Sequence, residues 1–497
     1  MGKRMRRLIA LAVAAAMVVS AMSGCGSERV SRDSDDVITL RILENDTAKE
    51  EGYLDELINA FNEAYADKGI QAADANMDEY SDLAENGPYG YGPDVLYQAN
   101  DKLMTYAEDK HLLAITPSDF DCYDYTSEET WGAFEINVDG EVYTCGIPVN
   151  VQVPMLFYRT DMLPGEWKTK WDDNSNGVPD FFENWNDLYK YSREIRESKN
   201  GGCKYGYMSS LNNLYLNSNF LFSYGAYIFG EDAEGKPDSS DIGFANADAA
   251  NGINALIQFA ALMNEGCIDD TITQNRAEKI AKGEYFCAVS TPDTYTSFVE
   301  KLELEYKSEG MTEDEAHEKA ESNMQMIELP GLMPADGDLS RDADEMSDSD
   351  WVDTVVMGGI NGYGISAYTE HKDACIEFVN FATSYNMLKL RSEMLGIVPT
   401  RSDVAGDCGD TADTISTSLN KGNIVLMPSI KAVDQIWTPV QTLMGDFAKD
   451  AFRSDAEKKY TSIADMQSAL EGADQDVYDA IYTPVSYTHL RAHETRS

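Results

Sequence analysis

The stretch Tyr143–Asp161 reads YTCGIPVNVQVPMLFYRTD and is the most strand-like part of the chain. Its β-branched and aromatic residues predict extended backbone over Val142–Tyr158, although Pro148 and Pro154 fall inside this range. Proline cannot donate to a strand ladder, so it occurs at sheet edges, strand starts and bulges. We therefore expect a β-rich segment that the two prolines interrupt.

Segments on both sides of this stretch alternate between strand and helix patterns. Upstream, Val37–Leu43 alternates as a strand does, and Leu54, Leu57, Ile58 and Phe61 follow at helical spacing. The pair Pro93–Tyr97 and Asp101–His111 repeats the order. Such alternation is typical of α/β domains. Further helices are expected from Trp185 onward and over Ala247–Asn264, Ala374–Phe381 and parts of Ile430–Phe452, with an acidic exposed loop over Gly337–Asp350.

The N-terminal residues have the layout of a secretory signal. Basic residues between Lys3 and Arg7 precede an apolar run, Leu8–Met22, and then Ser23-Gly24-Cys25. Small residues before a cysteine resemble the bacterial lipobox. We expect residues 1–24 to be a signal peptide, Cys25 to be lipidated, and residues 25–36 to form a flexible tether; a plain signal peptide or an uncleaved anchor are the alternatives.

Composition restricts the possible partners. The chain holds 87 Asp plus Glu against 39 Lys plus Arg, a formal net charge of −48 over 497 residues. Such a surface repels phosphate polymers, so we expect no nucleic acid partner. The length predicts two domains. The tail 486–497 carries His489, Arg491, His493 and Arg496 in an otherwise acidic, His-poor chain, and we expect it to be non-native.

The cysteines do not suggest a disulfide framework. The chain has 8 of them, and without Cys25 an odd number remains, widely spread and with no Cys-x-x-Cys pair. We expect mostly buried free thiols.

One motif predicts a metal site. The run Asp172–Glu183 reads DDNSNGVPDFFE and fills the calcium-loop pattern D-x-[DN]-x-[DN]-G followed by five residues and Glu. Oxygen ligands would come from side chains and one backbone carbonyl, with Gly177 at the sharp turn. An Asx-rich turn before a helix is the alternative. The expected ligands of a structural Ca²⁺ are Asp172, Asn174, Asn176, Val178, Asp180 and Glu183.

Five segments in order resemble the extracellular solute-binding proteins of bacterial carbohydrate ABC importers, the maltodextrin-binding type. Each segment alone is also a plausible piece of an ordinary α/β core, so their order and spacing carry the resemblance. They are LDELINAFNE (54–63), PDVLYQANDKLMTYA (93–107), YTCGIPVNVQVPMLFYRTD (143–161), AKGEYFCAVSTPDTY (281–295), and Gly358–Phe381 with Gly396–Thr400.

This resemblance implies an α/β fold of two lobes, the type II periplasmic-binding-protein fold, with a ligand cleft between the lobes. The chain would cross between lobes three times, near Gly146–Pro148, Glu328–Gly331 and Gly396–Pro399, where glycine and proline suit hinges. The first lobe would comprise 37–147 and 331–396, and the second 148–330 and 397–485.

The resemblance also implies which residues contact the ligand. Sugar sites combine planar hydrogen-bonding side chains with aromatic platforms. At Gln98 the best-known members of the family have an aromatic residue, which weakens the case for a long oligosaccharide. Trp131 and Trp351 are further candidates without a motif. The residues carried over are Asn45, Gln98, Asp101, Gln152, Asp293, Tyr295 and Trp437.

The function that follows is that of a monomeric, lipid-anchored substrate-binding protein on the extracellular face of the cell membrane. It would bind a sugar or oligosaccharide and deliver it to ABC transporter permease subunits. We expect no enzyme activity, because the sequence has no Gly-rich phosphate loop, G-x-S-x-G or H-E-x-x-H motif. The alternatives are a surface glycoside hydrolase, which would need two paired carboxylates, and a non-transport carbohydrate receptor.

Overall fold

The computed structural model describes residues 37–483, except 80, 139, 199–202, 234, 266–274, 409–414, 416–421 and 429. The predicted signal peptide, the tether with Cys25 and the C-terminal tail lie outside the described residues. None of the described helices is both long and apolar enough to span a membrane.

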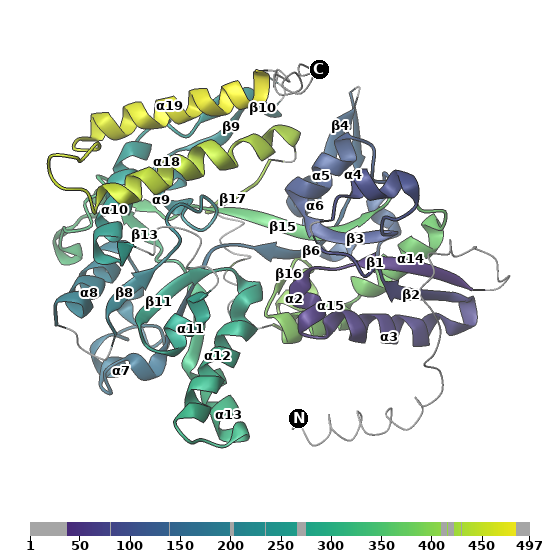
Figure 1. Ribbon diagram of the computed structural model, residues 1–497, viewed down its shortest axis with the longest axis horizontal. Coiled ribbons are helices and arrows are strands. Elements are labelled where there is room, and N and C mark those ends of the chain that lie inside the picture. The colour runs from purple at the N-terminus through teal and green to yellow at the C-terminus, as the bar shows by residue number, and fades with distance from the viewer. Residues whose placement is uncertain are drawn as a thin grey trace, which may run out of the picture. The chain divides into compact units, whose positions relative to one another are not determined.

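The larger sheet begins with the strand predicted over Val37–Leu43. Within the described residues it has seven strands in the order β16-β6-β15-β3-β1-β2, and β17 pairs with β15 beside it (Figure 1). β1 runs parallel to β2 and β3, as a β-α-β arrangement requires, whereas β15 runs antiparallel to β3 and β6. The strands are β1 (Ile38–Leu43), β2 (Ile70–Asp74), β3 (Val95–Ala99), β6 (Ile147–Gln152), β15 (Val356–Ile365), β16 (Val398–Pro399) and β17 (Ile424–Leu426).

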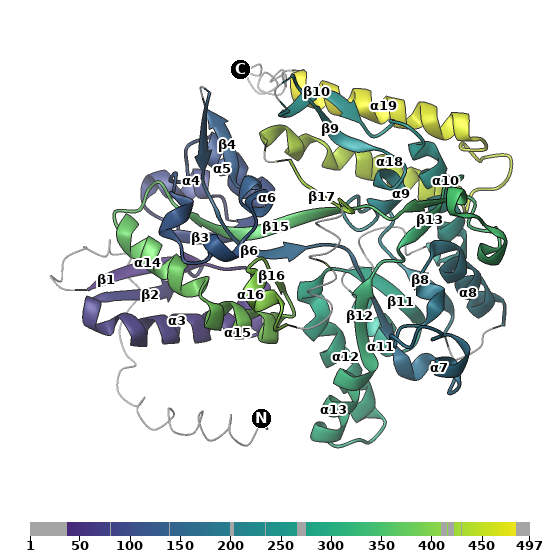
Figure 2. The same ribbon diagram turned by 180° about the vertical axis from the view of Figure 1, so that it is seen from behind.

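Helices cover both faces of this sheet and bury its apolar side chains (Figures 1 and 2). On one face, Leu57 and Phe61 of α3 pack with Phe378 of α14. On the other, Leu103 of α5 packs with Phe134. We call this sheet and its helices the first lobe. Its longer helices are α3 (Tyr53–Tyr65), α5 (Asn100–Glu108), α14 (Lys372–Ala382) and α15 (Tyr385–Leu395).

A second sheet has the order β12-β7-β11-β8. β11 is parallel to β8 and antiparallel to β7, and its six residues are all buried. With its helices it forms the second lobe, whose core includes Trp185, Phe259 and Phe286. Its elements are β7 (Met155–Arg159), β8 (Tyr205–Met208), β11 (Tyr285–Ser290), β12 (Met324–Glu328), α8 (Trp185–Ser198), α10 (Ala249–Leu262), α12 (Tyr295–Ser308) and α13 (Glu313–Asn323).

Two C-terminal helices belong to the second lobe. α18 (Trp437–Asp450) and α19 (Ile463–Tyr482), drawn in yellow-green and yellow in Figure 1, pack on α10 and on each other. α19 begins at a capping box in which Ser462 and Asp465 exchange hydrogen bonds. Helix was predicted in the region of α18, whereas α19 was not predicted.

Shorter strands, helices and 3-10 turns complete the two lobes. The small antiparallel pairs are β4 (Glu135–Val138) with β5 (Glu141–Thr144), β9 (Tyr227–Glu231) with β10 (Pro237–Gly243), and β13 (Leu332–Pro334) with β14 (Trp351–Asp353). The short helices are α2 (Asp46–Glu50), α4 (Leu83–Asn86), α6 (Glu128–Gly132), α7 (Trp167–Lys170), α9 (Asn219–Phe222), α11 (Arg276–Ala281) and α16 (Ser402–Ala405). The 3-10 turns are η1 (Ala66–Lys68), η2 (Gly87–Tyr89), η3 (Pro117–Asp119), η4 (Tyr123–Tyr125), η5 (Thr160–Met162), η6 (Asp180–Phe182), η10 (Pro292–Thr294), η11 (Ala343–Glu345), η12 (Asp348–Asp350) and η13 (Lys431–Gln435).

The chain changes sheets at positions that differ from the predicted crossings. Gly146–Pro148 leads into β6 of the first sheet, and the change follows at Pro154, before β7. Pro148 is tolerated because the register against β15 shifts at this point. The segment 332–353, predicted for the first lobe, packs with β13 against α8, and the chain enters the first sheet only at β15. β16 likewise pairs with β6 in the first sheet, although 397–485 was predicted for the second lobe.

The described cysteines are free thiols. Cys122, Cys145, Cys203, Cys287 and Cys375 are buried, and Cys408 is partly exposed. Burial raises the pKa of the Cys145 thiol to about 11, which keeps it protonated and unreactive at neutral pH.

Candidate ligand-binding site

Polar side chains collect where strands of both lobes end. Asn100 follows β3, and its side chain is fully buried. Its amide nitrogen donates to the carbonyl of Met427 (3.2 Å), and its amide oxygen accepts from the backbone N–H of Ile360 (3.2 Å). Asn100 therefore connects the start of α5 to β15 and to the segment after β17.

A second connection runs from the second lobe to the strand that leaves the first sheet. The hydroxyl of Tyr215, in the polar segment after β8, donates to the carbonyl of Gln152 at the end of β6 (2.6 Å). Burial raises the pKa of Tyr215, and the negative charges of Asp293 and Asp101 raise it further. Because charges act over short distances, these two carboxylates lie near Tyr215.

Two acceptors at this junction have no protein donor. Among the described residues, neither Oε1 of Gln152 nor Oδ1 of Asp293 has a hydrogen-bond partner, although both atoms are buried. A buried acceptor without a donor costs roughly 1–3 kcal/mol. Hydroxyl groups of a ligand would satisfy both atoms.

Acidic groups of both lobes also meet at α5 and η13. The hydroxyl of Thr105 lies 3.5 Å from Asp434 Oδ2, and the Lys431 ammonium lies 2.5 Å from Asp109 Oδ2. Burial raises the pKa of Asp101, which the charge of Asp434 also raises, and burial raises the pKa of Asp434 itself. Two acidic side chains, one from α5 and one from η13, therefore act on each other at the junction.

Three of the predicted ligand residues are thus gathered at this junction, namely Asp101, Gln152 and Asp293. The other predictions remain untested, and the structure gives several of these side chains roles within one lobe. Asn45 caps α2 by accepting from Ala48 N (2.9 Å). Gln98 donates to the carbonyl of Glu79 (2.5 Å), Tyr295 donates to the carbonyl of Met324 (3.3 Å), and Trp437 is half-buried against the second core.

Sequence reasoning missed Tyr215 and Asn100. Tyr215 lies in the run SSLNNLYLNSN, residues 209–219, which directly follows β8. Such a polar run immediately after a buried strand is a signal for a binding loop, because the carboxyl ends of strands face the ligand in open α/β sheets. Of the two unassigned tryptophans, Trp131 is buried in the first core, whereas Trp351 is partly exposed on β14.

The predicted calcium loop is held by its own side chains. Asp172 Oδ1 accepts from Gly177 N (3.2 Å), Asn174 Oδ1 from Asn176 N (3.0 Å), and Asn176 Oδ1 from Val178 N (2.8 Å). Gly177 has a φ of 78°, a value that favours glycine.

The end of the loop returns toward its start. The amide of Asn174 donates to Glu183 Oε1 (2.9 Å), and burial raises the pKa of Glu183, helped by the charge of Asp180. In the part of the chain that the structure describes, no three His, Cys, Asp or Glu side chains are grouped as a metal site requires. Calcium binding by Asp172, Asn174, Asn176, Val178, Asp180 and Glu183 therefore remains a prediction, in which three carboxylates, two amides and one backbone carbonyl would supply the oxygens.

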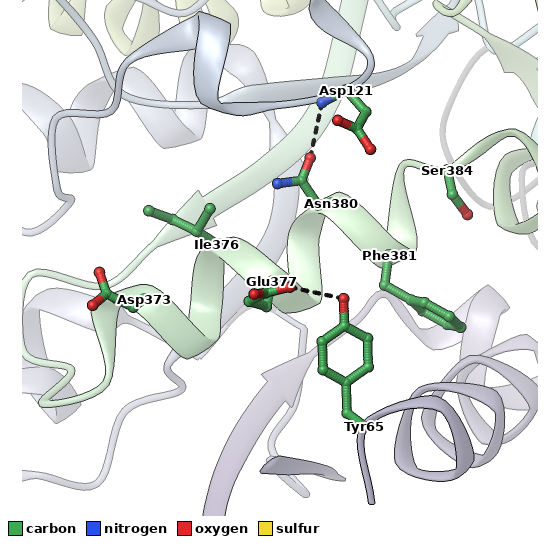
Figure 3. A pocket seen from close by; sticks show the side chains of 8 residues that line it. All are labelled: Tyr65, Asp121, Asp373, Ile376, Glu377, Asn380, Phe381 and Ser384. Atoms are coloured by element: carbon green, nitrogen blue, oxygen red, sulfur yellow. Dashed lines mark hydrogen bonds between the residues drawn. The ribbon is translucent and has the colours of Figure 1, made fainter. Parts of the chain in front are cut away.

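A surface cavity of about 550 Å³ lies away from the junction, between α3, α14 and the η3–η4 loop (Figure 3). Its polar groups are bonded to one another. The Tyr65 hydroxyl donates to Glu377 Oε2 (2.9 Å), and Asn380 Oδ1 accepts from Asp121 N (2.9 Å). These bonds hold α14 against its neighbours, and none of the predicted ligand residues lines this cavity.

Comparisons with known proteins agree with this architecture. The chain is 24% identical over 437 residues to the galactooligosaccharide-binding protein of Bacillus subtilis (86% of this chain, 89% of the relative). It is 20% identical over 430 residues to a maltooligosaccharide ABC transporter solute-binding lipoprotein of Streptococcus pneumoniae (85% and 88%). The crystal structure of the maltose-binding periplasmic protein MalE of Listeria monocytogenes superposes with a TM-score of 0.63 at 17% identity, covering 90% of this chain and 99% of that one.

The predicted fold is therefore confirmed: the chain has the two-lobe α/β fold of periplasmic binding proteins. Residues 56–408, more than half of the chain, match the family described as bacterial extracellular solute-binding protein. The chain belongs to the bacterial extracellular solute-binding proteins.

Proposed function

We propose that this protein captures a saccharide between its two lobes and delivers it to the permease subunits of an ABC importer. Two relatives that align with most of the chain are named as oligosaccharide-binding proteins, one of them as part of an ABC transporter. Both are binding proteins, which supports capture without catalysis. The chain would act as a monomer.

The observation that carries this proposal is the set of polar groups at the lobe junction. Oε1 of Gln152 and Oδ1 of Asp293 are buried acceptors without a donor among the described residues. The Tyr215 hydroxyl donates to the backbone carbonyl of Gln152 (2.6 Å). Sugar hydroxyls are donors and would complete these hydrogen bonds.

The charge at the junction favours an uncharged sugar. The charges of Asp101 and Asp293 act on Tyr215, and the charge of Asp434 acts on Asp101. The Lys431 ammonium is bound to Asp109, and the charge of Lys102 offsets part of the negative charge at Asp101 and Asp434. A uronic acid would place a further negative charge beside these groups, and like charges repel. We therefore expect neutral saccharides to bind and acidic ones to be rejected.

A panel screen by thermal shift tests this function. Maltotriose, galactobiose, raffinose, cellobiose and xylobiose serve as neutral probes, with digalacturonate as the acidic one. At 100 times its Kd a ligand stabilises the native state by about 2.7 kcal/mol. Stabilisation by a neutral probe with no cleavage product on chromatography supports the proposal. Product release would instead indicate a glycoside hydrolase, and no stabilisation by any neutral probe would contradict saccharide capture.

We also propose that Cys25 anchors the protein to the outer face of the cell membrane through lipid. The sequence Ser23-Gly24-Cys25 at the end of the apolar run supports this, as does the word lipoprotein in the name of one relative. Replacing Cys25 by Ala should release the protein into the medium or leave it unprocessed. Unchanged membrane fractionation and mass would rule out the anchor.

A further inference from the structure

A second cavity, of about 670 Å³, lies in the second lobe and is separate from the lobe junction. It opens between the predicted calcium loop, helix α8 and the segment that carries β13 and β14. None of the predicted saccharide-binding residues lines it, whereas Asn174, Asp180 and Glu183 of the predicted calcium loop do. Its volume is in the range of small-molecule sites, roughly 300–1,000 Å³. We call it the α8 groove, and define it by Trp171, Asp180, Asn184, Asp187, Tyr191 and Trp351.

Aromatic rings form two walls of the α8 groove. Trp171 packs edge-to-face against Phe181 (5.4 Å between ring centroids) and Tyr191 (5.5 Å). The Lys170 ammonium lies 4.1 Å from the centroid of the Trp171 ring. Trp351 lines the groove from β14 and is partly exposed. Trp351 is therefore the ring that remains available to a ligand.

The backbone at Trp351 is held in place, although Trp351 follows an acidic loop. β14 pairs with β13, and Trp351 lies opposite Pro334. The preceding residue, Asp350, accepts from Arg341 (2.8 Å) and caps its own turn through Ser347. These contacts fix the backbone that carries the indole, which lowers part of the entropic cost of ordering a stacked ring.

Planar hydrogen-bonding groups line the remaining wall. The amide of Asn184 donates to Asp187 Oδ2 (2.7 Å) and its oxygen accepts from Asp187 N (2.8 Å), so both side chains are oriented. Asp180 accepts from the backbone N–H of Asp173 (3.2 Å). Carboxylates retain free lone pairs after one such bond and can accept from hydroxyl groups.

The charge of the groove excludes anions. Six carboxylate side chains line it against two ammonium groups, those of Lys170 and Lys190. Lys170 is engaged with Trp171, and Lys190 lies 3.7 Å from Asp342 Oδ1. A partly exposed indole beside oriented carboxylates matches a sugar ring, which has an apolar face and an edge of hydroxyl donors.

We propose that the α8 groove is a second saccharide-binding site for neutral sugar chains, with Trp351 as its stacking platform. All of its lining residues are contributed by the second lobe and by the segment packed on it. Binding there does not depend on the lobe junction. The site would hold a polysaccharide or long oligosaccharide on the outside of the protein.

Affinity electrophoresis tests this site with the full mature chain in calcium-containing native gels. The gels contain soluble starch, β-1,4-galactan, xyloglucan or galactomannan, with polygalacturonate as the acidic comparison. At least one neutral polysaccharide should retard the wild type. Trp351→Ala should weaken this retardation about tenfold, because aromatic stacking contributes roughly 0.5–1.5 kcal/mol beyond the buried area. Trp351→Phe should restore most of it, and Tyr478→Ala, an exposed aromatic on α19, should behave as wild type.

Thermal melting of each variant shows that it is folded. Absence of retardation by every neutral polysaccharide would overturn the proposal, as would equal retardation of the wild type and Trp351→Ala. Equal or stronger retardation by polygalacturonate would overturn the charge argument. If Asp293→Asn abolishes retardation while Trp351→Ala does not, the polysaccharide binds at the lobe junction and the α8 groove is not a site.

Discussion

The Tyr215 hydroxyl donates a 2.6 Å hydrogen bond to the backbone carbonyl of Gln152. This bond links the polar loop after β8 to the last residue of β6, immediately before the chain changes sheets at Pro154. The two residues belong to different lobes, and the charges of Asp101 and Asp293 both act on Tyr215. Tyr215 therefore lies where a ligand between the lobes would be held.

Replacing Tyr215 by Phe should lower saccharide affinity several-fold and cost about 1 kcal/mol of stability, because one buried hydrogen bond is lost. Calorimetric titration and urea unfolding measure the two effects. Tyr224→Phe is the matched control, since its hydroxyl donates to Pro334 O (2.8 Å) elsewhere in the second lobe. The control should lose similar stability without losing affinity. Equal affinities in the two variants would remove Tyr215 from the site.

The buried ion pair of the first lobe is predicted to be essential for its stability. Arg391 binds Glu44 through two bonds of 2.7 and 2.9 Å, and both side chains are at most 1% exposed. Arg391→Met should lower the free energy of unfolding by about 3–5 kcal/mol, because Glu44 is left as an unpaired buried charge. The double variant Glu44→Gln/Arg391→Met should recover part of this loss. Lys389→Met, which breaks only an exposed pair on the same helix, should cost less than about 1 kcal/mol.

If Arg391→Met and the double variant unfold at the same urea concentration, the unpaired charge is not the cause of the loss. Urea unfolding followed by circular dichroism distinguishes the two results.

The carboxylate of Asp446, near the end of α18, is predicted to make the stability of the protein fall at acidic pH. Burial raises the pKa of Asp446, but hydrogen bonds from Tyr460, Lys459 and Arg453 outweigh it and lower the pKa to about 2. The folded pKa is thus below the unfolded value of about 4. The stabilisation is complete above pH 4 and is lost as the pH falls toward 2. Asp446→Asn should be less stable than wild type by a constant amount from pH 7 to about pH 4.5, and the difference should shrink below that. A difference that grows on acidification would contradict the assignment.

The calcium loop is predicted to make thermal stability depend on the metal, because Ca²⁺ would bind the folded loop better than the unfolded chain. A chelator should lower the melting temperature of the wild type. Asp172→Ala should abolish the response to chelator, although it also loses the bond from Gly177. Asp238→Ala, which removes a partly exposed carboxylate outside the loop, should keep it. Identical melting of the wild type with chelator and with millimolar calcium would show that the loop is only an Asx-rich turn and binds no calcium.

The sequence allowed prediction of those strands and helices whose hydrophobic spacing lies entirely within their own residues. Alternation gave the strand Ile38–Leu43, and apolar spacing gave the helix Ala249–Leu262. The ten-residue strand Val356–Ile365 was not predicted as a strand because it carries four glycines, which are unfavourable in strands. Its tertiary contacts require them: a Cβ at Gly362 would lie 2.5 Å from the carbonyl of Ile147.

The candidate site was only partly predictable for the same reason. Asp101 and Asp293 follow strands, and the family resemblance indicated them as ligand residues. Tyr215 was not, because its partner Gln152 is 63 residues away and only folding brings them together. The observed end of the first lobe's first segment also differs from the predicted one. β6 pairs with β15, so Ile147–Gln152 belongs to the first sheet beyond Pro148.

The central claim, that one saccharide contacts both lobes, is tested most directly by calorimetric titration of the saccharide that stabilises the wild type into Asp101→Asn and Asp293→Asn. These residues come from α5 of the first lobe and η10 of the second. Hydrogen bonds to charged groups contribute roughly 1.5–3 kcal/mol, so each substitution should weaken affinity about tenfold or more while the variant melts as a folded protein. Unchanged affinity in either folded variant would place the ligand in one lobe alone and contradict capture between the two.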